Sequence, residues 1–159
     1  MSFSAPQFSL GLRGLPRDRL DQVIHRVARD HRVRRATAVR WFEELDKFLV
    51  VCSTTKKPVS PPPRVDKAWH TFILFTRDYA SYCSASHGRF IHHDPFEKPD
   101  AEAYERAYLA AEARFGSLDR RIWPPLASRS GGWGIGGGWV GGDWIGGSWG
   151  GGGCGGGGC

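Results

Sequence analysis

Residues 35–52 read R-A-T-A-V-R-W-F-E-E-L-D-K-F-L-V-V-C, and their apolar positions recur at intervals of three and four. This spacing places one stripe of side chains along a single face of an α-helix. Trp41 and Phe48 widen the stripe, so we expect this helix to lie at the centre of the hydrophobic core. The stripe itself consists of Ala38, Phe42, Leu45, Leu49 and Cys52.

Further helices are predicted on both sides of this segment. After Pro16, apolar residues again recur at helical spacing, whereas the consecutive prolines at 61–63 favour an extended link. Three more helices are expected over residues 64–75, 76–88 and 100–115. The first and last helices should bury two sets of residues, namely Leu20, Val23, Ile24 and Val27, and Tyr104, Tyr108, Ala111 and Phe115.

The sequence therefore predicts an all-α protein, because no alternation typical of β-strands extends over a useful length. We expect a single small helical domain of four to five helices with a disordered glycine-rich C-terminal tail. The predicted boundaries are an N-terminal arm at 1–15, the helical domain at 16–128 and a Gly/Trp/Cys-rich low-complexity tail at 129–159.

The tail repeats with a period of five residues, and nearly everything between the repeated positions is glycine. Such a chain loses too much backbone entropy to fold alone, so we interpret it as a flexible segment that binds a protein partner. Metal binding through its thiols, a ribosomal peptide precursor with a modified Gly/Cys/Ser tail, and a plain solubilising tail remain alternatives. The repeated positions are Trp139, Trp144, Trp149, Cys154 and Cys159.

Positive charge is concentrated near the amino terminus, where residues 1–40 contain nine arginines and three acidic residues. A solvated helix face followed by a basic turn explains this excess, and an anionic partner is the alternative. Neither a secretion signal nor an apolar run long enough to span a bilayer is present, so a cytoplasmic protein is predicted. The arginines concerned are Arg26, Arg29, Arg32, Arg34 and Arg35.

Residues able to bind a metal are grouped in the middle of the chain. Asp66 and His70 are four apart and share one face of a predicted helix, and Cys83, His92 and His93 follow. Cysteine, histidine and aspartate together suit zinc or another divalent metal. The alternative is a polar pocket in which the aspartate orients His70 while Cys83 is a small buried residue.

Three segments resemble the glycine-rich domain-containing protein-like family, namely P-P-P-R-V-D-K-A-W-H-T-F-I-L (61–74), T-R-D-Y-A-S-Y-C (76–83) and G-R-F-I-H-H-D-P (88–95). The resemblance implies the helical fold, the central site and a glycine-rich segment beyond the domain, but no reaction. Phe72 replaces a second histidine common in that family, and His92 is the residue that could compensate. The family pattern falls on Val65, Asp66, Trp69, His70, Thr71, Tyr79, Cys83, His93 and Asp94.

Together these observations predict a small helical binding domain rather than an enzyme, with a His/Cys/Asp metal or structural site and a tail that engages a partner. The alternative is a metal-dependent, zinc-like hydrolase or modifying enzyme. Cys83 and His70 would then form a thiol–imidazole pair oriented by Asp66. No sequence context marks a nucleophile turn or an oxyanion loop, which favours the binding domain.

Overall fold

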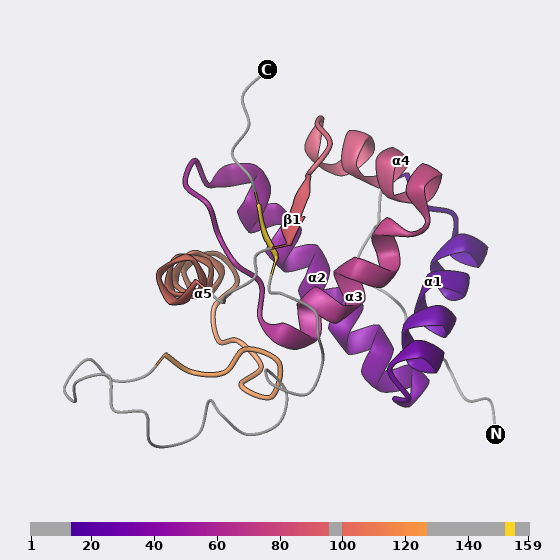
Figure 1. Ribbon diagram of the computed structural model, residues 1–159, viewed down its shortest axis with the longest axis horizontal. Helices are drawn as coiled ribbons and strands as arrows, with labels where there is room; N and C mark the ends of the chain where they lie inside the picture. Colours follow the sequence, from indigo (N-terminus) through magenta and orange to yellow (C-terminus); the bar gives the residue numbers. More distant parts are fainter. Residues whose placement is uncertain (1–13, 96–99, 127–151, 155–159) are drawn as a thin grey trace.

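The computed structural model describes residues 14–95, 100–126 and 152–154 of the chain. Residues 14–126 are mainly helical, and their described part contains five α-helices (Figure 1). In chain order the elements are α1 (Arg17–Asp30), α2 (Arg35–Thr54), α3 (Pro63–Ile73), α4 (Thr76–His87), β1 (His93–Pro95), α5 (Ala101–Phe115) and β2 (Gly152–Cys154). The prediction of an all-α domain is confirmed for residues 14–126.

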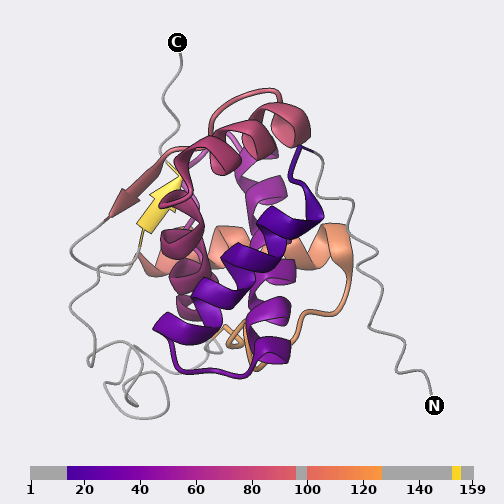
Figure 2. The same ribbon diagram turned by 90° about the vertical axis from the view of Figure 1, so that its right-hand side faces the viewer.

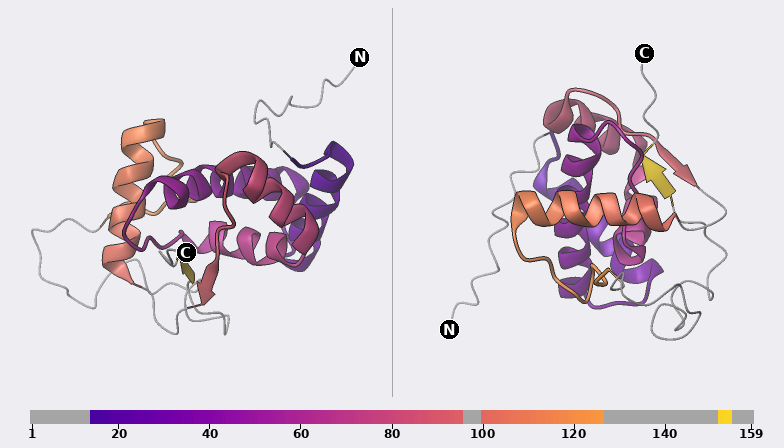
Figure 3. Two further views of the ribbon diagram at one scale, coloured as in Figure 1. Left: turned by 90° about the horizontal axis from the view of Figure 1, so that it is seen from above. Right: turned by 90° about the vertical axis from the view of Figure 1, so that its left-hand side faces the viewer.

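Helix α2 lies at the centre of the domain, as its wide apolar stripe predicts. It contacts α1, α3 and α5, and α1 lies across both α2 and α3 (Figure 2). Helix α5 packs on α2 and runs steeply across it near one end of the α2–α3 pair (Figure 3). The stripe residues of α2 are all buried, and so are Trp41 and Phe48. The other helices of the core therefore pack around α2.

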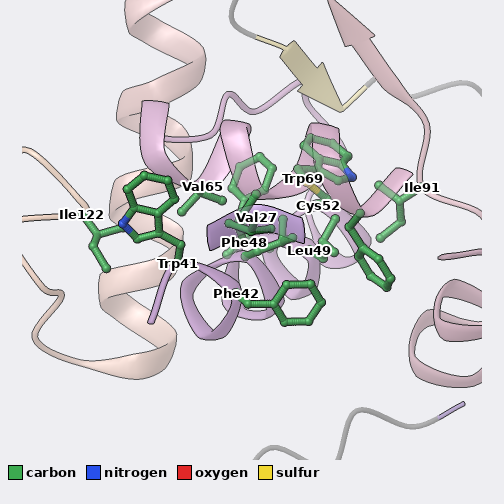
Figure 4. Packing of buried hydrophobic residues seen from close by; sticks show 14 of the residues in the cluster. Val27, Trp41, Phe42, Phe48, Leu49, Cys52, Val65, Trp69, Ile91 and Ile122 are labelled. Atoms are coloured by element: carbon green, nitrogen blue, oxygen red, sulfur yellow. The ribbon is translucent and has the colours of Figure 1, made fainter. Parts of the chain in front are cut away.

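The core is a single cluster built largely of aromatic and branched side chains. Figure 4 shows Phe48 and Leu49 in its middle, with Ile122 toward one side and Ile91 toward the other. Aromatic rings meet edge to face, as between Phe48 and Trp69, whose centroids are 5.5 Å apart. The cluster thus joins α2 and α3 to the residues that follow α4 and α5.

Helix boundaries follow local signals in the sequence. Pro63 occupies the first turn of α3, where its missing N–H costs nothing. Gly88 ends α4 in the left-handed conformation with φ of 68°, and the Asp100 carboxylate caps α5 by accepting a hydrogen bond from the Ala103 N–H at 2.9 Å. One expectation for α5 is wrong, because Phe115 is 38% exposed at the end of its helix.

Two short strands lie outside the helices, and the sequence did not predict them. β1 pairs with β2 in antiparallel orientation, with His93 opposite Cys154 and Asp94 opposite Gly153. Three residues in each strand are too few to show the alternation by which strands are recognised.

Most of the tail lies outside the described residues, so its predicted disorder remains a prediction. The same holds for the tail positions Trp139, Trp144, Trp149 and Cys159. At the other end, Leu15 is buried and Gly14 approaches α4, so the packed chain begins within the predicted arm. Among the described residues, no helix has the length and apolar character required to cross a bilayer.

Candidate metal centre

Asp66, His70 and His93 bring their side chains together at the junction of α3 and β1. One potential ligand atom from each residue lies within 4.8 Å of the others. The Asp66 Oδ1 atom is 3.0 Å from His93 Nε2, and its Oδ2 atom is 3.2 Å from His70 Nδ1. The two imidazole rings meet edge to face with centroids 4.3 Å apart. The aspartate therefore lies between two histidines that come from different elements.

Helix α3 supplies two of the three side chains. Asp66 follows Pro63 within the first turn of α3, where the helix dipole favours a negative charge. His70 lies one turn later on the same face, and its Nδ1 atom is also 2.8 Å from the Asp66 carbonyl oxygen. The sequence prediction that these two residues share a face is confirmed.

The site is enclosed on one side and open on the other. The side chains of His93 and Asp66 are 6% and 9% exposed, whereas that of His70 is 30% exposed. Trp69 lies against His93, with ring centroids 4.3 Å apart, and is itself fully buried. An ion or a small molecule would therefore reach the cluster from the His70 side.

Electrostatics in the cluster favour a charged aspartate. Burial acts to raise the pKa of Asp66, but hydrogen bonds with His70 and His93 outweigh it and hold this pKa below its usual value. The hydrogen bond with Asp66 raises the pKa of His70, against burial, which lowers it. The ionised carboxylate attracts a cation, but the raised pKa also favours a protonated His70, and an ion that binds this ring has to displace the proton.

A second layer of hydrogen bonds holds the segment that carries His93. The Trp69 indole N–H donates to the Tyr79 hydroxyl at 2.9 Å, and that hydroxyl donates to the Ile91 carbonyl at 2.6 Å. Tyr79 is 1% exposed and belongs to α4. Trp69 and Tyr79 thus support the cluster and are not part of it.

Two predicted ligands lie outside this group, contrary to the expected five-residue site. His92 is exposed and its ring lies against Phe90, with centroids 4.8 Å apart. Cys83 is fully buried in α4 and has a free thiol, whose pKa is raised by burial. Asp94 is also exposed. The choice that sequence left open between the adjacent histidines is settled in favour of His93.

Phe72, which replaces the second histidine of the resembling family, faces the core. It is fully buried and its ring contacts Phe42 and Tyr79 at centroid distances of 5.0 and 5.1 Å. A side chain at this position points away from the Asp66 cluster and into the packing between α2 and α4. His92 therefore has no vacant position to fill here.

The donor set fits a borderline divalent ion such as Zn²⁺, for which two imidazoles and one carboxylate are common ligands. Three protein ligands leave a coordination position for water or for another group. The same three side chains also satisfy one another by hydrogen bonding, and no buried side-chain nitrogen or oxygen among the described residues lacks a partner. Both a metal centre and a polar structural cluster are consistent with this geometry.

The basic segment is partly neutralised by neighbouring acids. Arg26 and Arg29 both pair with Asp30, and Arg35 pairs with Asp21 at 2.5 Å. Two more of the predicted arginines, Arg32 and Arg34, are exposed in and after the turn between α1 and α2. Ion pairing of this kind is expected of a solvated helix face, and an anionic partner stays a prediction.

Comparison with family models gives a match over residues 17–115, from the start of α1 to the end of α5. The chain belongs to the UCP032817-like family. The match includes all three residues of the cluster and stops before the tail. Nothing in this match links the chain to the glycine-rich domain-containing protein-like family. Neither the curated proteins nor the solved structures gave a match.

Proposed function

We propose that this chain is a small helical metal-binding domain in which Asp66, His70 and His93 hold one divalent ion such as Zn²⁺. The observation that carries the proposal is the convergence of two imidazoles on one buried carboxylate, with all potential ligand atoms within 4.8 Å. His93 is 27 residues from Asp66 in sequence, so the fold brings it to the site. Asp66 and His70 contact each other within α3, and this contact alone would not require His93.

The test is metal content by elemental mass spectrometry on the full chain purified without chelator. Wild-type protein should contain about one equivalent of metal, and His70→Ala should lose most of it, because a ligand lost from three leaves a weak site. His92→Ala is the matched control, since this exposed neighbour of His93 lies outside the cluster. Metal-free wild-type protein, or equal metal in His70→Ala, would refute the proposal and leave a polar structural cluster.

A metal-dependent hydrolase or modifying enzyme is the second candidate. It is favoured by one observation, which is that the His70 side chain is 30% exposed and opens the cluster to solvent. Three ligands leave room for a metal-bound water, whose lowered pKa is the usual source of a nucleophile in such enzymes. If the site is a binding or structural one, His70→Ala should lower the melting temperature. If the protein is an enzyme, His70→Ala should keep its fold and lose turnover.

The tail adds an interaction segment to this domain. We propose that Trp139, Trp144 and Trp149 bind a protein partner, because repeated aromatic residues on a glycine chain allow several weak contacts at once. Replacing all three with alanine should abolish partner binding and leave the helical domain folded. The peptide-precursor alternative predicts instead a mass loss located at Cys154 or Cys159 in protein from the native source.

A further inference from the structure

His93 reaches the cluster from a short segment that needs support. α4 ends at His87, and β1 begins at His93 itself, so the five residues 88–92 connect them. Within this connection Ile91 is buried, 4% exposed, and its carbonyl accepts the hydrogen bond from Tyr79. The position of His93 is therefore linked to a side chain on the preceding helix.

The contacts form a closed circuit between α3 and α4. Trp69 on α3 donates to Tyr79 on α4, and Tyr79 donates to Ile91. Two residues later His93 returns to α3 by its contact with Asp66 at 3.0 Å. Trp69 and Asp66, at the two ends of the circuit, both belong to α3. The circuit therefore limits where the His93 imidazole can lie.

We propose that Tyr79 is a positioning residue that sets His93 in place for metal binding through the Ile91 main chain. This inference rests on the proposed metal site, and it assigns to Tyr79 no contact with the ion. The Tyr79 hydroxyl is suited to the task because it is buried and accepts one hydrogen bond while donating another. Burial also raises the pKa of Tyr79, which keeps the hydroxyl protonated and able to donate.

The decisive variant is Tyr79→Phe in the full chain, which removes the hydroxyl and keeps the ring. Its matched control is Tyr104→Phe, because the Tyr104 hydroxyl also donates to a main-chain carbonyl, that of Pro124 at 2.8 Å. Both variants leave a carbonyl without its tyrosine donor, but only the Ile91 carbonyl lies next to the cluster. Tyr79→Phe also leaves the Trp69 indole N–H without its acceptor, within the same circuit. If Zn²⁺ binding were weakened only because the fold is less stable, both variants should show the weakening.

Zn²⁺ affinity is measured by competition with a chromogenic chelator. Tyr79→Phe should weaken Zn²⁺ binding about ten- to a hundred-fold, the usual effect of removing a group that orients a metal ligand. Tyr104→Phe should bind like the wild type. A folded Tyr79→Phe variant with wild-type affinity would overturn the inference, and so would equal weakening in both variants.

A second readout does not require metal, so the two proposals can fail separately. In metal-free protein, the ¹⁵N resonances of the His93 imidazole should shift in Tyr79→Phe and stay in place in Tyr104→Phe, because His93 loses its position against Asp66. If the wild type binds no Zn²⁺, the proposed function fails while this comparison still decides the role of Tyr79. Unchanged His93 resonances would overturn the role.

A third measurement uses the wild-type chain and covers the case of a variant that does not fold. Coupling between two sites is reciprocal, so an ion bound by His93 should stabilise the hydrogen bond that positions it. The exchange of the Tyr79 hydroxyl proton should therefore become slower when Zn²⁺ is added. Equal exchange rates at saturating Zn²⁺ would contradict the coupling.

Discussion

The indole N–H of Trp123 donates to the Glu44 carboxylate at 2.8 Å, across 79 residues of sequence. Trp123 is fully buried and Glu44 is 7% exposed, so this bond lies inside the domain. It ties the segment after α5 to the middle of α2. The compact domain consequently extends beyond the matched family region and includes the residues around 123.

Replacement of Glu44 by alanine should destabilise the domain. The change leaves a buried indole N–H without its acceptor, at a cost of about 1–3 kcal/mol in the free energy of unfolding. Urea denaturation measures this cost, and Glu44→Gln is the control because it keeps an acceptor oxygen in place. Equal stability of Glu44→Ala and the wild type would show that the bond contributes nothing.

Gly14→Ala should be strongly unfavourable for two separate reasons. An added Cβ would lie 2.7 Å from both the Ala85 Cβ and the Ser81 carbonyl oxygen of α4, and the residue has a φ of +82°. The control is Gly88→Ala, whose φ is +68° but whose Cβ would meet nothing within 4 Å. We expect the control to lose about 1–2 kcal/mol of the free energy of unfolding, from backbone strain alone, and Gly14→Ala to lose more. Thermal unfolding of the two variants gives the comparison, which fails if their losses are equal.

Acid should destabilise the wild type relative to His87→Gln. Burial lowers the pKa of His87 below its usual value of 6.5, with the charge of Asp46 opposing and that of Arg89 assisting. The unfolded chain therefore binds a proton more readily than the folded one, so this stability is present above pH 6.5 and is lost as the pH falls through the folded pKa. For this one group, the free energy of unfolding should change by no more than about 1.4 kcal/mol per pH unit.

The measurement is the free energy of unfolding of both proteins at several pH values between 5 and 7.5, which span the unperturbed histidine pKa of ~6.5. Substitution of the exposed His25 by glutamine is the control. A difference between the wild type and His87→Gln that does not change with pH would contradict the assignment.

Cys83→Ser should retain its metal. The thiol is fully buried in α4 and lies outside the Asp66 cluster, so serine removes no ligand of the proposed ion. Some stability is lost because the thiol interacts with the Ile91 main chain and the Tyr79 side chain, and a smaller hydroxyl in its place alters these contacts. Metal content and melting temperature are both measured, and a variant that folds but loses its metal would restore Cys83 to the ligand set.

Helical periodicity predicted most of the fold because each helix packs one apolar face on the same core. All four residues expected on the inner face of α1 are buried, and the break between α3 and α4 lies at residues 74–75, close to where the sequence placed it. Phe115 was misassigned because it is the last residue of α5, where the periodic pattern continues although the side chain is 38% exposed.

The site was predictable only in part. Asp66 and His70 follow from spacing on one helix, whereas the choice between His92 and His93 depends on the path of a short connection. Adjacent residues in extended backbone point to opposite sides, so one of them had to face out, but no local pattern tells which one. The tertiary bond from Tyr79 to Ile91 fixes the path of this connection, and a single sequence does not reveal that bond.

An ion shared by Asp66 and His93 would also act as a cross-link within the chain. It would close a loop that contains all of α4, much as a disulfide closes a loop between distant cysteines. Because only the folded chain presents all ligands together, the free energy of binding would be added to that of folding. The durability of the domain would then follow the supply of metal in its surroundings, and a chelator would shorten its lifetime without touching a single apolar contact.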